Sequence, residues 1–212
     1  PVIAALQQRV TELEAQLLKA ESEHAEEVAL DDVTGLPNRL LLIDRIRNAV
    51  SRSERNDRVT AVVILDLDLF RRINDALGIV IGDKVLRKVG ERLAAILRNS
   101  DTVSFLGEGS GALTVSRTGA DEFGILLSDL ENAEAVTWVV KRLLNNMTAP
   151  FSIDGNDIFI SCSAGISLFP HDATDPETLL GNASMARYTA KRRLGRNNFA
   201  FFAEDLNENS FR

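Results

Sequence analysis

The hydrophobic positions of this chain follow helical and strand periods in turn, which predicts a domain of mixed secondary structure. Apolar residues recur every three or four positions and predict helices over about 38–53, 69–77, 83–98, 132–147 and 176–192. Apolar or alternating runs predict strands over 59–66, 113–118, 123–128, 151–153, 158–168 and 198–202. This order predicts the α+β class, with helices around a mixed sheet.

The strand at 59–65 (VTAVVIL) is almost entirely apolar, which indicates burial on both faces. It ends in Asp66, Leu67 and Asp68, and the two-residue period of a strand puts both aspartates on one face. Ligand clefts in α/β sheets open at the carboxyl ends of strands, and carboxylate oxygens suit Mg²⁺. For Asp68 we favour a different role, as the N-cap of the helix that begins near Leu69.

A second pair of acids, Asp121 and Glu122, lies at a turn between two predicted strands. Gly119 at this turn permits close approach of the backbone to a bound group, and the apolar run from Phe123 anchors the turn in a core. A solvated loop tip is the alternative interpretation. Because two acidic sites occur in one chain, we expect Asp66 to share a divalent ion with Asp121 or Glu122.

Composition narrows the class of protein. The 212 residues are 45% hydrophobic and can hold one α/β domain with an appendage. The net charge of -7 argues against a broad nucleic-acid surface. The lone Cys162 lies in an apolar run, which predicts a buried thiol in a reducing, cytoplasmic setting.

No segment reaches the roughly 20 apolar residues of a membrane span. The start at Pro1 indicates a piece of a longer chain, in which membrane tethering elsewhere stays open.

The predicted units are an N-terminal helical stalk over 1–29, a catalytic-type domain over 30–203 and the start of a linker over 204–212. In the stalk, apolar residues fall on alternating steps of three and four for about three heptads. They are Ile3, Leu6, Val10, Leu13, Leu17 and Ala20. We favour a coiled-coil dimer, and an amphipathic helix packed on its own domain is the alternative.

Four blocks of the chain resemble the GGDEF family of diguanylate cyclases. Residues 66–86 match D-x-D-x-F-K-x-x-N-D-x-x-G-H-x-x-G-D-x-x-L, except at Arg71 and Ile79. Residues 31–39 (DDVTGLPNR) look like the opening motif D-x-L-T-G-L-P-N-R, and residues 119–123 (GADEF) are a variant of the name motif. Residues 182–197 are similar to N-A-D-x-A-M-Y-x-A-K-x-x-G-R-N. The blocks cover roughly residues 31–200 in the family's order.

The resemblance implies a fold and a reaction. The fold is a central mixed five-stranded sheet flanked by helices, related to the palm of nucleotide cyclases and polymerases. In the reaction, two GTP molecules on two facing domains condense to cyclic di-GMP with the help of Mg²⁺ or Mn²⁺. Each 3′-hydroxyl attacks the α-phosphate of the other nucleotide, and two pyrophosphates leave.

The resemblance also assigns roles to single residues. Asp66, Asp121 and the Leu67 carbonyl would bind metal, and Asp121 and Glu122 would be catalytic. The substrate-binding residues would include Asn74 and Asp83 for guanine, Lys191 and Arg196 for phosphate with Arg71 assisting, and Gly119 and Ala120 at the turn. Taken singly, Asn74 and Asp83 are also typical helix caps, and the basic run at Lys191 is typical of solvated surface.

The chain departs from the family pattern near these residues. Ala120 replaces the second glycine, and a need for positive φ there would make the added Cβ cost about 1 kcal/mol. The stretch from Lys191 to Gly195 is one residue longer than in the pattern, which shifts Arg196. About a dozen residues are inserted over 104–115, and their Gly/Ser centre predicts a hairpin excursion.

Arg98 and Asp101 resemble the family's R-x-x-D product-inhibition motif, which binds cyclic di-GMP. The insertion over 104–115 separates the two residues from the acidic turn. We therefore favour a helix-end salt bridge between them.

Three functions fit the sequence. The first is an active diguanylate cyclase that works as a homodimer through the N-terminal helix. The second is a regulatory domain that binds GTP without useful turnover, since the tail 201–212 resembles the linker to an EAL phosphodiesterase domain in GGDEF-EAL hybrids. A purely structural dimerisation domain is the third.

Overall fold

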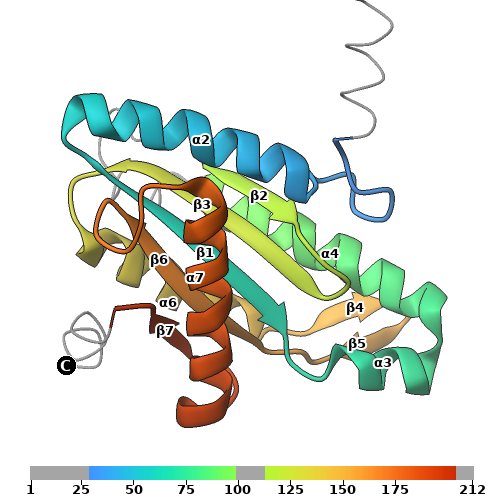
Figure 1. Ribbon diagram of the computed structural model, residues 1–212. Helices are drawn as coiled ribbons and strands as arrows, with labels where there is room; N and C mark the ends of the chain where they lie inside the picture. Colours follow the sequence, from blue (N-terminus) through green and yellow to red (C-terminus); the bar gives the residue numbers. More distant parts are fainter. Residues whose placement is uncertain (1–28, 99–112, 204–212) are drawn as a thin grey trace, which may run out of the picture.

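The computed structural model describes residues 29–98 and 113–203 (Figure 1). The predicted stalk, Asp101, most of the 104–115 insertion and the 204–212 linker lie outside these residues. The described residues form a five-stranded sheet of order β2-β3-β1-β6-β7 with helices on both faces, which confirms the predicted α+β class. No helix within the two ranges is long and apolar enough to cross a bilayer.

The central strand is β1 (Val59–Leu67), which is buried at every position but the first. It pairs antiparallel with β3 (Glu122–Leu130) on one side and β6 (Cys162–Phe169) on the other. At the edges, β2 (Thr114–Arg117) runs antiparallel to β3, and β7 (Phe199–Phe201) runs parallel to β6. The continuous apolar run of the sequence is therefore explained by burial on both faces of the central strand.

Helices cover both faces of the sheet (Figure 1). The helices α2 (Arg39–Asn56) and α7 (Pro176–Thr189) pack on a core that includes Val62 and Ile64 of β1. The opposite core contains Val63 and Leu65 and is covered by α4 (Ile79–Arg98) and α6 (Ala133–Met147). Alternate residues of β1 thus supply opposite cores, as the two-residue period requires.

One helix begins earlier than predicted. Gly78, with φ of 86°, alone separates α3 (Phe70–Leu77) from α4, which starts at Ile79 and not near Asp83. Gly82 lies buried inside α4 against Asn74. The lack of a side chain at Gly82 lets α3 and α4 approach closely.

The predicted strand over 158–168 is divided in two. Its first residue belongs to β5 (Asn156–Ile158), which pairs with β4 (Phe151–Ile153) in a separate two-stranded sheet. The hairpin turn consists of Asp154 and Gly155, with φ of 50° and 80°, and the positive values are typical of the tight turns that join hairpin strands. This turn is two residues long, whereas the strands predicted over 151–153 and 158–168 leave four residues, 154–157, between them.

The C-terminal end of α7 continues into a π-helical turn, η1 (Ala190–Leu194). A π-helix holds more residues per turn than an α-helix, so such turns are places where a helix takes up an additional residue. The extra residue between Lys191 and Gly195 is accommodated in this turn.

Candidate functional site

The acids that end β1 and the acids of the β2–β3 turn meet at one edge of the sheet. The strand register sets Asp66 of β1 opposite Glu122 of β3. One residue further, the Leu67 N–H donates to the carbonyl oxygen of Asp121 at 3.0 Å. The structure therefore brings together the acids that the sequence separates by more than fifty positions.

Asp68 does not cap α3, so the favoured sequence interpretation was wrong. Leu69 takes the N-cap position with φ of 61° and no side-chain hydrogen bond. The buried Asp68 carboxylate instead accepts from the hydroxyls of Ser161 and Ser163, at 2.8 and 2.9 Å, and from the Asn197 N–H at 3.1 Å. Because β6 is antiparallel to β1, its first residues bring Ser163 and the preceding Ser161 to the end of β1, out of reach of any local sequence pattern.

Two cations from the end of α7 engage the buried Asp66. The Arg187 guanidinium donates to Oδ2 of Asp66, and Lys191 Nζ lies 2.5 Å from Oδ1. Arg187 also pairs with Glu122, with Nη2 at 3.6 Å from Oε2, and Lys191 lies 3.5 Å from Oδ1 of Asp68. Both cations thus reach the same acid from one stretch of chain, Arg187 from α7 and Lys191 from η1.

Lys191 was predicted at the site, but Arg187 was missed. The family pattern given above has methionine at this position, so an arginine there was the signal that could have revealed it. The side chain is only 21% exposed, a low value for an arginine, and its charge is matched by the acids.

A glycine of β6 lets α7 come close enough for these contacts. A Cβ built on Gly165 would lie 2.0 Å from the Ala183 carbonyl oxygen and 2.1 Å from the Arg187 N–H nitrogen. The helix backbone therefore rests directly on the strand, which only glycine allows. Gly165 pairs with Ile64 of β1, two residues before Asp66.

Burial at this edge, together with a neighbouring acid, raises the pKa of Asp121. Burial is the main cause, and the negative charge of Asp66 adds to it, whereas the charges of Lys191 and Arg187 lower the pKa by less. Burial likewise raises the pKa of the Cys162 thiol, which is free and buried as predicted. Asp121 therefore holds a proton more readily than an ordinary aspartate.

The acidic turn itself is held by Arg117. Its guanidinium donates to the carbonyl oxygens of Gly119 and Ala120, at 3.1 and 2.8 Å, and to the carboxylate of Asp31. Ala120 is absent from the described residues with positive φ, so the expectation of strain at this position does not hold. An alanine fits the backbone of the turn.

The predicted guanine-binding residues lie on α3 and α4. Oδ1 of Asn74 is buried and has no hydrogen-bond partner among the described residues. Asp83, one residue after the Gly82 that Asn74 contacts, is half-buried and forms no ion pair with the described part of the chain. Neither residue caps a helix, since α4 starts at Ile79.

The other predicted substrate-binding residues are not brought into this cluster. The side chain of Arg71 is 92% exposed, and its only ion pair within the described ranges is to Asp75 at 3.8 Å. Arg196 is exposed and contacts none of the acids. Arg98 is the exposed last residue of α4, and Asp101 lies outside the described residues.

As arranged, the acids do not form a ready metal site. The donor types suit Mg²⁺, but both carboxylate oxygens of Asp66 are bonded to cations. The described ranges contain no group of three or more Asp, Glu, His or Cys side chains placed to hold a metal. Asp66, Asp121 and the Leu67 carbonyl could therefore hold one only after the cations move.

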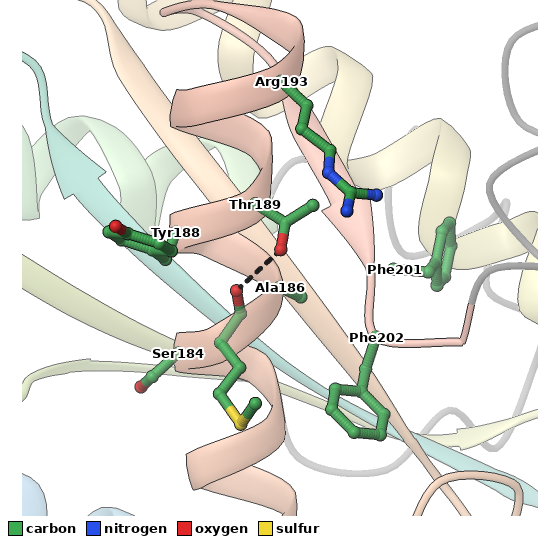
Figure 2. A pocket seen from close by; sticks show the side chains of 8 residues that line it. Ser184, Ala186, Tyr188, Thr189, Arg193, Phe201 and Phe202 are labelled. Carbon is green, nitrogen blue, oxygen red and sulfur yellow. Dashed lines mark hydrogen bonds between the residues drawn. The ribbon is translucent and has the colours of Figure 1, made fainter.

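A groove of about 440 Å³ lies between α7 and β7 (Figure 2). It is lined by exposed apolar residues that include Met185, Tyr188 and Phe202, and by none of the acids described above. The Thr189 hydroxyl inside it donates to the Met185 carbonyl at 3.3 Å, so this polar group is satisfied within the helix. The groove and the acidic edge are thus separate features.

The fold agrees with the comparisons to known proteins. The family model for "Diguanylate cyclase, GGDEF domain" matches residues 28–198, so the chain belongs to the GGDEF family. It is 37% identical over 205 residues to the bifunctional diguanylate cyclase/cyclic di-GMP phosphodiesterase MucR of Pseudomonas aeruginosa. The match covers 97% of this chain and 28% of MucR.

Two further relatives come from the same organism. The cyclic di-GMP phosphodiesterase NbdA is 35% identical over 198 residues, which cover 93% of this chain and 24% of NbdA. The crystal structure of the GGDEF domain of TpbB superposes with a TM-score of 0.70 and 33% identity, over 79% of this chain and 97% of that one. The chain therefore spans about a quarter of the length of MucR and NbdA.

Proposed function

We propose that this domain binds GTP and reads its base with Asn74 and Asp83. The observation that carries the proposal is the buried Oδ1 of Asn74, which has no partner among the described residues. An unpaired buried acceptor costs about 1–3 kcal/mol, and a bound N–H would remove that penalty. Guanine offers N–H donors and carbonyl acceptors on one edge, which an amide and a carboxylate complement.

The triphosphate would extend from this base toward the acidic edge. The helix that carries Asn74 begins just after Asp68, and the ammonium group of Lys191 forms ion pairs with Asp66 and Asp68. Lys191 would donate to phosphate oxygens, and the exposed Arg71 and Arg196 are free to swing toward them. The proposed cofactor is Mg²⁺ or Mn²⁺.

The reaction that we propose for bound GTP is condensation to cyclic di-GMP across a homodimer. Each 3′-hydroxyl loses its proton and forms a bond to the α-phosphorus of the other nucleotide, whose bond to pyrophosphate breaks. Asp121 and Glu122 are the proposed catalytic residues. The raised pKa of Asp121 improves it as an acceptor of that proton.

A second function is favoured by the ion pairs of Arg187. With Asp66 and Glu122 already neutralised, the domain would bind GTP without turning it over and would regulate an adjacent EAL phosphodiesterase domain. The name of MucR combines cyclase and phosphodiesterase activities, which supports a hybrid origin for this chain.

Incubation of the purified chain with GTP and Mg²⁺ or Mn²⁺ separates these functions. Cyclic di-GMP in the resolved nucleotides supports the cyclase, and bound GTP without product supports the regulatory domain.

Asn74→Ala should weaken GTP binding about tenfold, which corresponds to about 1.4 kcal/mol. Asp75→Ala, a change at the exposed neighbouring residue of α3, should leave it unchanged. Equal affinities of the two variants would contradict the role of Asn74.

A further inference from the structure

Arg187 lies between Asp66 and Glu122, two acids that could share a divalent cation. Its guanidinium contacts Oδ2 of Asp66 and lies 3.6 Å from Oε2 of Glu122, so it bridges the end of β1 and the start of β3. Both acids are largely buried, with side chains 12% and 19% exposed. A cation that bridges two buried carboxylates performs the charge neutralisation that a metal would otherwise supply.

The surrounding charges make this neutralisation important. Four carboxylates, those of Asp66, Asp68, Asp121 and Glu122, face two cations, Arg187 and Lys191. Loss of Arg187 would leave the acids with Lys191 alone, and the repulsion between them would grow. The acids would then attract a divalent ion more strongly.

Arg187 is nevertheless imperfectly bound. Its Nε is buried and has no hydrogen-bond partner among the described residues. A buried donor without a partner offsets part of what the two ion pairs contribute. The position of the guanidinium therefore leaves one of its own polar groups unsatisfied.

We propose that Arg187 competes with the divalent ion for Asp66 and Glu122 and thereby sets the metal affinity of this site. The inference rests on the proposed function for its biological meaning, since the ion would accompany GTP. Metal binds only when Arg187 releases Asp66, so the chain alone holds Mn²⁺ weakly. A side chain without charge at position 187 removes this competition.

The test is a Mn²⁺ titration of the whole chain without nucleotide, with free Mn²⁺ followed by electron paramagnetic resonance. Arg187→Met should bind Mn²⁺ at least about tenfold more tightly than the unaltered chain, a change of about 1.4 kcal/mol. Arg187→Lys keeps the charge and should stay weak. Arg192→Met removes the same charge from an exposed side chain that contacts Tyr188, and it should change nothing.

Two further variants make the result decisive. Asp66→Asn added to Arg187→Met should abolish the gain, which assigns it to this site. Arg187→Gln provides the uncharged comparison if the methionine variant fails to fold. Equal Mn²⁺ affinity for the unaltered chain and the uncharged variants overturns the proposal. Because GTP is absent, that failure is distinct from a failure to bind GTP.

Discussion

The guanidinium of Arg117, the last residue of β2, donates from one nitrogen to both carboxylate oxygens of Asp31, at 3.0 and 3.1 Å. The two residues lie 86 positions apart. Since the same guanidinium binds the carbonyl oxygens of the acidic turn, this pair joins the opening segment of the domain to the turn that carries Asp121.

We expect Arg117→Met to lower the free energy of unfolding by about 2–4 kcal/mol, because it leaves a partly buried carboxylate and two carbonyls without their donor. Urea denaturation measures the loss. Arg47→Met is the matched control. Among the described residues Arg47 forms only exposed ion pairs, to Asp44 and Glu177, and its loss should cost less than about 1 kcal/mol. Equal losses in unfolding free energy would show that the pair with Asp31 stabilises the domain no more than an exposed ion pair does.

The stabilisation by Asp31 should depend on pH. Burial acts to raise the pKa of Asp31, but hydrogen bonds from Thr34 and Arg117 outweigh it and hold the pKa below its ordinary 3.8. A depressed folded-state pKa contributes stability that is present above the unfolded value and is lost as the pH falls through the folded value. The deficit of Asp31→Asn in unfolding free energy should therefore be larger at about pH 6 than at about pH 3. A deficit that is the same at both pH values would refute this.

Gly165→Ala should destabilise the domain by about 3 kcal/mol or more, because the new methyl group would meet the backbone of α7. Displacement of α7 would also move Arg187 and Lys191 away from Asp66. Gly181→Ala is the control within α7, where an added Cβ would meet no atom of the described residues within 4 Å beyond its chain neighbours and the backbone of its own helix. It should stabilise the helix by about 0.5–1 kcal/mol. Thermal unfolding of both variants measures the contrast, and a tolerated Gly165→Ala would contradict the close packing.

Ala120→Gly should not stabilise the turn, since Ala120 has no positive φ that a glycine would relieve. The added freedom of the unfolded chain should instead lower the unfolding free energy by up to about 1 kcal/mol. Chemical denaturation beside the unaltered chain provides the measurement. A clear gain in stability would restore the idea of backbone strain at this position.

Much of the fold could be predicted because the strongest signals are local. The apolar run of β1 and the Asp-Gly turn of the small hairpin each identify their element without the rest of the chain. The division of the strand over 158–168 could not be predicted, because residues 159–161 continue its pattern and only the separate pairing of β5 with β4 ends it. The sequence also suggested that Asp66 and Asp121 converge, and the antiparallel register of β1 and β3 brings them together.

The electrostatic partners at the site were harder to predict. Asp68 looked like a helix cap because its nearest sequence neighbours start a helix. Its partners are instead Ser163 of β6, Ser161 just before that strand, and Asn197. Arg187 was missed because its role depends on how closely α7 approaches the sheet, which a contact at Gly165 decides. Tertiary contacts of this kind leave no periodic signal in the sequence.

The π-helical turn after α7 affects how this domain tolerates the gain or loss of a single residue. An ordinary helix that gained one residue would rotate everything after it by about 100°. Here the widened turn lets Lys191 stay on the face of Asp66 while Phe199 still enters the sheet beside Ala164. Single insertions or deletions in this stretch would therefore be absorbed locally, and neither the charge cluster nor the edge of the sheet would have to shift register.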